Sequence, residues 1–125
     1  MLNKKIILGV TGGIAAYKVG ELIRLLKKNG ADIQVVMTKS ATKFVSPLTL
    51  QALSGKPVLE NMWEPSKGNG MEHINQSRAS DLIIIVPSSA NFIAKVSQGI
   101  ADDLLTNICL ARNCPLLIAP SMNRE

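Results

Sequence analysis

The chain has 125 residues, of which 46% are hydrophobic, and a formal net charge of +5 at pH 7. This length suits a single domain, and the longest apolar run, Leu82–Val86, is far too short to cross a bilayer. These features exclude a membrane-spanning protein. Because no charged leader with a long apolar stretch opens the chain, we expect a cytoplasmic location.

Basic residues are concentrated in the first 50 positions, where eight lysines and arginines stand against two acidic residues. Four of the eight fall on the outer face of one predicted helix: Lys18, Arg24, Lys27 and Lys28. A solvated helix face explains this charge better than a nucleic-acid-binding surface does, because the chain has only four aromatic side chains to stack on bases. We therefore expect neither a nucleic acid nor a membrane as a partner.

The first half of the chain predicts two strands joined by a helix. Residues 4–10 are interpreted as a buried strand and residues 33–37 as a second one. The helix between them follows Gly13 and ends at Asn29-Gly30. Its core-facing positions recur at helical spacing: Ala15, Val19, Leu22, Ile23 and Leu26. This order predicts a right-handed βαβ unit that leaves residues 38–40 at the same sheet edge as the first glycine loop.

The rest of the chain alternates predicted helices and strands. Ser46 and Pro47 begin a helix that ends at Gly55, and residues 58–59 form a short strand. Residues 61–70 are rich in helix-breaking residues and predict a surface loop, after which residues 71–74 re-enter the fold. The remaining predicted elements are a strand over 81–86, helices over 91–96 and 101–112, and a last strand over 116–119.

These elements predict an α/β fold, with a three-layer Rossmann-like (flavodoxin-like) parallel sheet and helices on both faces. Three of the strands end in clusters of Gly, Ser, Asn or Pro, at residues 11–13, 87–91 and 120–123. Open α/β sheets bind ligands in the crevice outside the carboxyl ends of their strands. We therefore expect a ligand site along this edge.

The first of these clusters, in residues 9–14, offers backbone N–H groups and a hydroxyl at a helix N-terminus, where a phosphate or a carboxylate is favoured. The loop does not match the GxGxxG pattern. The second strand is followed by Thr38-Lys39-Ser40, and not by the acid that holds the ribose in NAD enzymes. A mononucleotide is thus favoured over NAD. A glycine turn needed only for helix–sheet packing is the alternative.

The second cluster, Ser88-Ser89-Ala90-Asn91, offers two hydroxyls and an amide to a ligand at the sheet edge, or a simple helix cap. The third contains Asn123, whose amide N–H can donate to a carboxylate. The paired acids Asp102 and Asp103 are interpreted as belonging to a helix N-terminus, because adjacent helical residues point about a third of a turn apart.

Few side chains suit proton transfer or metal binding. His73 is the only histidine, and its ordinary pKa near neutrality suits acid–base work, although a lone histidine is also common in a purely structural role. Cys109 and Cys114 lack the spacing of a zinc site or a disulfide framework. We expect reduced core thiols and no bound metal.

Six segments of the chain, taken together and in this order, resemble the flavin-containing cysteine decarboxylases. The resemblance covers nearly all of residues 1–125 and is closest to the phosphopantothenoylcysteine decarboxylase branch, whose bacterial members are joined to a synthetase. The segments that carry it are Gly12–Lys18, Met37–Ser40, Glu72-His73-Ile74, Pro87–Lys95, Gly99–Thr106 and Pro120–Asn123.

The resemblance implies that FMN binds between the subunits of a trimer, with trimers often assembled into a dodecamer. His73 resembles the catalytic histidine of the family, and Asn123, together with Met122, resembles the part that binds the substrate carboxylate. The residues that correspond to the FMN site are Gly12, Gly13, Ile14, Thr38, Ser40, Ser88, Ser89, Ala90 and Asn91.

The implied reaction removes CO₂ from 4′-phospho-N-pantothenoyl-L-cysteine and gives 4′-phosphopantetheine, a step in coenzyme A biosynthesis. A cysteine carboxylate has no electron sink of its own. In the family, the flavin provides one by oxidising the thiol-bearing carbon to a thioaldehyde, with the histidine as base, so that CO₂ can leave and the product is then reduced.

The chain departs from the family pattern after Asn123. Family members continue to a Met-Trp pair and a flexible segment with a cysteine that covers and protonates the intermediate, whereas this sequence ends at Glu125. We therefore expect a C-terminally truncated decarboxylase domain with incomplete turnover. Two alternatives remain: a flavin prenyltransferase-like enzyme, and an FMN-binding fragment or regulatory protein without catalysis.

Overall fold

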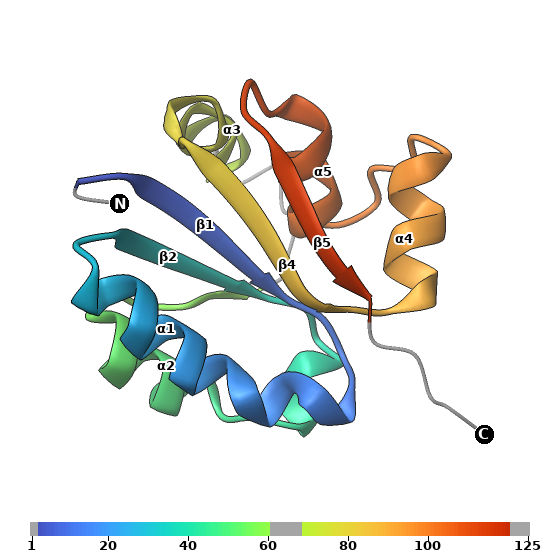
Figure 1. Cartoon of the computed structure of the whole chain (residues 1–125). Helices are drawn as coiled ribbons and strands as arrows, with labels where there is room; N and C mark the ends of the chain where they lie inside the picture. Colours follow the sequence, from blue (N-terminus) through green and yellow to red (C-terminus); the bar gives the residue numbers. More distant parts are fainter. Residues whose placement is uncertain (1–2, 61–68, 121–125) are drawn as a thin grey trace.

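The computed structural model describes residues 3–60 and 69–120, which form a five-stranded parallel sheet with the strand order β3-β2-β1-β4-β5 (Figure 1). The strands are β1 (Lys5–Val10), β2 (Asp32–Met37), β3 (Leu59–Glu60), β4 (Leu82–Ser88) and β5 (Leu116–Pro120). Ile7 of β1 lies opposite Gln34 of β2 on one side and Ile83 of β4 on the other. The order reverses at β1, so the crevice expected for a doubly wound sheet lies where β1 and β4 end.

Helices cover both faces of the sheet, as predicted, and the fold is Rossmann-like (Figure 1). On one face lie α1 (Val19–Lys28) and α2 (Pro47–Ser54), and on the other α3 (Asn69–Ala79), α4 (Ala90–Ser97) and α5 (Leu104–Ala111). Successive side chains of a strand point to opposite faces. Accordingly, Ile6 and Leu8 join the core cluster under α1, and Ile7 joins the cluster under α5.

Local signals account for the ends of α2 and α5. The Ser46 hydroxyl accepts a hydrogen bond from the Leu48 N–H, Pro47 is the first residue of α2, and Gly55 ends this helix with a φ of 83°. At α5, the carboxylate of Asp103 accepts a hydrogen bond from the Thr106 N–H at 2.8 Å, and the Asp103 N–H donates to the Thr106 hydroxyl. The predicted helix over 101–112 therefore starts later, at Leu104, because Asp103 is its cap.

Two further boundaries differ from the prediction. The helix expected after Gly13 begins as a short 3-10 segment, η1 (Ile14–Lys18), and becomes α-helical at Val19. Because a 3-10 turn has three residues, the buried position of this segment is Ala16, whereas the predicted Ala15 is half-buried. The predicted loop over 61–70 lies mostly outside the described residues, and α3 already begins at Asn69.

The two cysteines are free, in agreement with the expected reduced thiols. Cys109 is fully buried in the cluster under α5, where burial raises the pKa of its thiol to about 12. The thiol therefore stays neutral near pH 7, and Cys109 acts as a small apolar core residue. In the described part of the chain, no helix has the length and hydropathy needed to cross a membrane.

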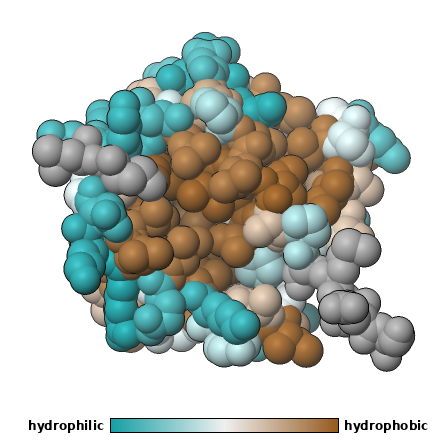
Figure 2. Space-filling view, in the orientation of Figure 1, coloured by the Kyte–Doolittle hydropathy of each residue, from teal (hydrophilic) through white to brown (hydrophobic). Residues whose placement is uncertain are grey.

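In the part of the chain that the structure describes, no helix covers the face of β5 that carries Leu117 (Figure 1). Leu117 of β5 lies opposite Ile84 of β4 and remains 56% exposed. In the orientation of Figure 1, a hydrophobic surface occupies the centre of the molecule over these strands and is bordered by hydrophilic residues (Figure 2). A patch of this kind marks a surface suited to contact with another polypeptide segment.

Candidate functional site

A cavity of about 340 Å³ opens at the carboxyl edge of the sheet, where the loops after β1, β2 and β4 meet. Its position is the one expected from the reversal of strand order beside β1. The residues that line it are Thr11, Gly12, Thr38, Lys39, Ser40, Ser89, Asn91, Phe92, Lys95 and Asp103. The polar residues after three strands, far apart in the sequence, thus form one pocket.

The loops after β1 and β2 touch each other at Gly12. A Cβ atom built on Gly12 would lie 2.7 Å from the Cβ of Ser40, so only glycine allows this approach. The Thr38 N–H donates to the Val10 carbonyl at 3.0 Å, and the Thr38 hydroxyl accepts from the Ala41 N–H at 3.2 Å. Thr38 and Ser40 are thereby held at the edge of the pocket next to the glycine loop.

Thr11 ties the end of β1 to the end of β4. Its buried hydroxyl donates to the Pro87 carbonyl at 2.6 Å and accepts from the Ser89 N–H at 2.8 Å. The Thr11 N–H also donates to the Pro87 carbonyl, at 3.2 Å. These three bonds fix the backbone of residues 87–89, which leads to the pocket-lining Ser89.

Replacing Thr11 by valine is expected to lower the free energy of unfolding by about 1–3 kcal/mol, because the half-buried Ser89 N–H loses its acceptor while the side-chain volume is kept. Thr11→Ser, which keeps the hydroxyl, should lower the free energy of unfolding clearly less. Urea denaturation of both variants measures the difference. A Thr11→Val protein as stable as the wild type would contradict the bracing role of the hydroxyl.

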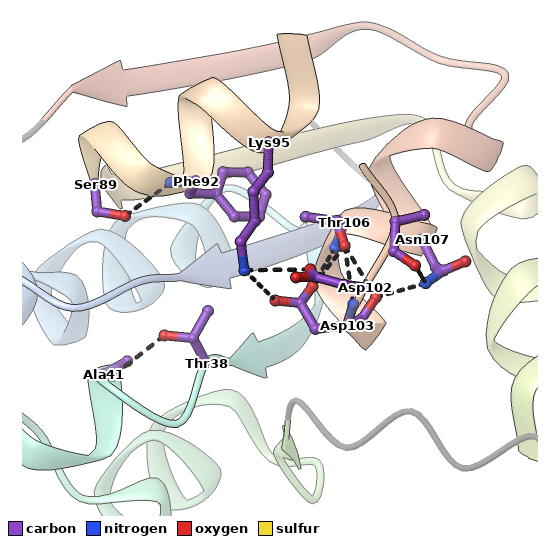
Figure 3. Close-up of polar contacts among 10 residues, drawn as sticks. Thr38, Ala41, Ser89, Phe92, Lys95, Asp102, Asp103, Thr106 and Asn107 are labelled. Atoms are coloured by element: carbon purple, nitrogen blue, oxygen red, sulfur yellow. Dashed lines mark hydrogen bonds and ion pairs between the residues drawn. The ribbon is translucent and has the colours of Figure 1, made fainter. Parts of the chain in front are cut away.

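The N-terminus of α4 forms the side of the pocket that lies opposite Thr38 and the loop after β2 (Figure 3). The Ser89 hydroxyl caps this helix by accepting from the Phe92 N–H at 3.1 Å, and Asn91 is exposed at the pocket. Ser88 is fully buried, and its hydroxyl has no hydrogen-bond partner within the described residues. A buried polar group without a partner requires an explanation, and Ser88 directly precedes the pocket-lining Ser89.

Charged residues from α4 and from the two positions before α5 complete this side (Figure 3). The Lys95 ammonium lies 3.2 Å from the Asp102 carboxylate and 3.8 Å from that of Asp103. Figure 3 shows Lys95 extending from α4 toward both carboxylates at the start of α5. Lys95 thus links the two helices at the rim of the cavity.

Five of the predicted site residues line the cavity together: Gly12, Thr38, Ser40, Ser89 and Asn91. Gly13, Ser88 and Ala90 are their chain neighbours but do not line it, and Ile14 is 71% exposed. His73 lies in α3, half-buried, and its Nδ1 atom has no hydrogen-bond partner in the described ranges. Met122 and Asn123 lie outside the described residues.

Thr11, whose hydroxyl belongs to the predicted glycine loop, also lines the cavity, and sequence reasoning missed four further lining residues: Lys39, Phe92, Lys95 and Asp103. A signal was available for Lys95, because it stands four residues after Asn91 and so shares a helix face with it. For Thr11 the position at a strand end was a signal, but its bonds to residues 76 and 78 positions away were not visible in the sequence.

Fold and pocket together define the class: a doubly wound α/β protein with a ligand site at the carboxyl edge of its sheet. The Flavoprotein family model matches residues 1–125, and the chain belongs to this family.

Similar proteins include the Coenzyme A biosynthesis bifunctional protein CoaBC of Haemophilus influenzae, 52% identical over 123 residues, which are 98% of this chain and 31% of that protein. The chain thus spans about a third of the length of this relative. Among solved structures, the FMN-dependent cysteine decarboxylase SpaF is 36% identical, with a TM-score of 0.86 over 96% of this chain and 69% of that one. A PPC decarboxylase mutant complexed with pantothenoylaminoethenethiol is 31% identical, with a TM-score of 0.77, and the match covers 97% of this chain and 68% of that one.

Proposed function

We propose that this chain is an FMN-binding decarboxylase domain that removes CO₂ from 4′-phospho-N-pantothenoyl-L-cysteine to give 4′-phosphopantetheine, a step in coenzyme A biosynthesis. One observation carries the proposal: the polar strand-end loops form a single pocket in a chain that is 52% identical, over 98% of its length, to a coenzyme A biosynthesis protein. The whole of residues 1–125 is assigned to this domain.

The pocket has the groups that a flavin mononucleotide needs. Gly12 lets the loop after β1 approach Ser40 of the loop after β2, and beside the pocket the buried Ser88 hydroxyl has no partner among the described residues. Hydroxyls and an amide can bind the phosphate and the polar edge of the ring, while Phe92 provides an apolar contact. We assign FMN binding to Gly12, Gly13, Ile14, Thr38, Ser40, Ser88, Ser89, Ala90 and Asn91.

When bound, the flavin supplies the electron sink that a cysteine carboxylate lacks. His73 is assigned as the base that takes a proton from the substrate during oxidation. Its unpartnered Nδ1 atom, within the described part of the chain, is consistent with a group kept free for a ligand. Asn123 and Met122 are assigned to the substrate carboxylate by resemblance alone.

We further propose that the chain associates with itself, as a trimer or a dodecamer, in the cytoplasm. The surface offers large apolar side chains for such contacts: Ile14 is 71%, Tyr17 64% and Leu117 56% exposed. Leu117 belongs to the hydrophobic surface over β5, and a contiguous apolar surface marks an interaction site (Figure 2). No nucleic acid and no membrane is required as a partner.

The experiment that tests this function mixes the flavin-loaded chain with phosphopantothenoylcysteine and, separately, with dimethylallyl phosphate. We expect the first compound to bleach the oxidised flavin absorbance and to release CO₂, with the absorbance returning as the product is reduced to 4′-phosphopantetheine, and the second to leave the spectrum unchanged. A new flavin spectrum with dimethylallyl phosphate alone, after the flavin has been reduced with dithionite, would instead support prenyl transfer, because the reduced flavin is the nucleophile that displaces phosphate. No response to either compound would leave a flavin-binding protein without this activity and contradict the proposed reaction.

A further inference from the structure

The rim of the cavity carries an unequal set of charges on its α4–α5 side. The Lys95 side chain is 24% exposed and contacts two carboxylates, at 3.2 Å for Asp102 and 3.8 Å for Asp103. Two negative groups therefore face one positive group. The net charge on this side of the pocket therefore depends on the single ammonium group of Lys95.

The two carboxylates differ in their other contacts. Asp103 accepts hydrogen bonds from the Thr106 N–H at 2.8 Å and the Thr106 hydroxyl at 2.7 Å, so it is committed to capping α5 (Figure 3). Asp102 precedes the cap, is 53% exposed, and within the described ranges has its ion pair with Lys95 alone. Removing the charge of Asp102 therefore changes the electrostatics of the rim without removing the cap.

Across the cavity, the loop after β2 contributes Lys39, which is exposed and forms no ion pair among the described residues. The glycine loop and Ser40 on that side present donors to an anion. A phosphate placed in a pocket this small lies within about 8 Å, the screening length at physiological ionic strength, of much of the opposite wall. Its affinity must then depend on whether the carboxylates of that wall are neutralised.

We propose that Lys95 is a charge-balancing residue of the flavin pocket: by pairing with Asp102 and Asp103, it allows the pocket to accept the phosphate dianion of FMN. This inference rests on the proposed function, because it takes FMN as the ligand. Lys95 is thus a positioning and electrostatic residue, distinct from the groups assigned to contact the flavin.

The test compares the affinities for FMN and for riboflavin, which lacks the phosphate, by titrating each flavin into the apoprotein and following quenching of its fluorescence. Lys95→Met keeps the aliphatic stem and removes the charge, and should weaken FMN binding about tenfold while changing riboflavin binding less than about twofold. Asp102→Asn should tighten FMN binding, since it removes a negative charge. Lys95→Arg should keep the wild-type preference for FMN.

The opposite directions of the Lys95 and Asp102 variants separate charge from structure, because a purely structural ion pair weakens binding when either partner is removed. Arg24→Met is the matched control. It breaks the exposed ion pair to Glu21, at 2.8 Å on α1 and outside the lining of the pocket, and should leave both affinities unchanged. Thermal unfolding of each apoprotein verifies that the variants are folded.

Three results would overturn the inference. The first is that Lys95→Met weakens the binding of riboflavin as much as the binding of FMN. The second is that Asp102→Asn weakens the binding of FMN, as Lys95→Met does. The third is that both variants bind FMN with the same affinity as the wild type. A wild-type chain that binds neither flavin would instead overturn the proposed function, and this inference with it.

Discussion

Replacing His73 by asparagine is expected to leave FMN bound and to slow flavin reduction by phosphopantothenoylcysteine by at least about a hundredfold. Asparagine keeps a polar side chain of similar reach but cannot accept a proton near neutral pH. His73 is half-buried in α3, and its Nδ1 atom is unpartnered in the described residues, so the substitution leaves no hydrogen-bond partner of that atom without its bond. Rapid mixing with substrate, followed by flavin absorbance, measures the rate.

The control is the flavin affinity of the same variant, which should match that of the wild type. A second control is Asn75→Ala, on an exposed position of the same helix, which should reduce flavin at the wild-type rate. Undiminished reduction by the His73→Asn protein would remove His73 from the mechanism.

The largest expected effect on stability is that of Ile85→Ala, which should lower the free energy of unfolding by about 2–5 kcal/mol. Ile85 is fully buried in the cluster under α5, on the interior strand β4 that leads into Ser88 and Ser89. Its Cδ1 atom lies 2.6 Å from the position of a Cβ built on Gly9, so strand β1 packs directly against it. Truncation leaves a cavity that these neighbours fill only in part.

Leu48→Ala is the matched control for this prediction. Leu48 is also a large aliphatic residue, but it is 71% exposed on α2, and its truncation should change the free energy of unfolding by less than about 0.5 kcal/mol. Chemical denaturation of both variants gives the comparison. Equal losses in the two variants would show that the cluster under α5 is not a tightly packed core.

The order and type of the main elements were predictable because their signals are local. Ser46, Pro47 and Gly55 mark the two ends of α2 in the sequence itself, and the apolar runs of β1 and β4 match strands buried on both faces. The start of α3 was not predictable in this way. Residues 61–70 are rich in residues that disfavour a helix, so the sequence predicts a loop there, whereas α3 already begins at Asn69.

The candidate site was predictable where it consists of strand ends. Parallel strands bring their carboxyl ends to one edge, so Gly12, Ser40 and Ser89 had to lie near one another once the strand order was known. The charged side formed by Lys95 and Asp103 depends instead on how α4 packs against α5. That packing is a tertiary property, which the spacing of residues within either helix does not encode.

The single measurement that tests the account most directly is the flavin content of the purified chain. Its absorbance spectrum, and mass spectrometry of the cofactor released on heating, should show a yellow protein that carries FMN in a stoichiometric amount, and light scattering of the same sample should give a mass above that of one chain. A colourless, monomeric protein that takes up no FMN on titration would contradict the assignment of the pocket.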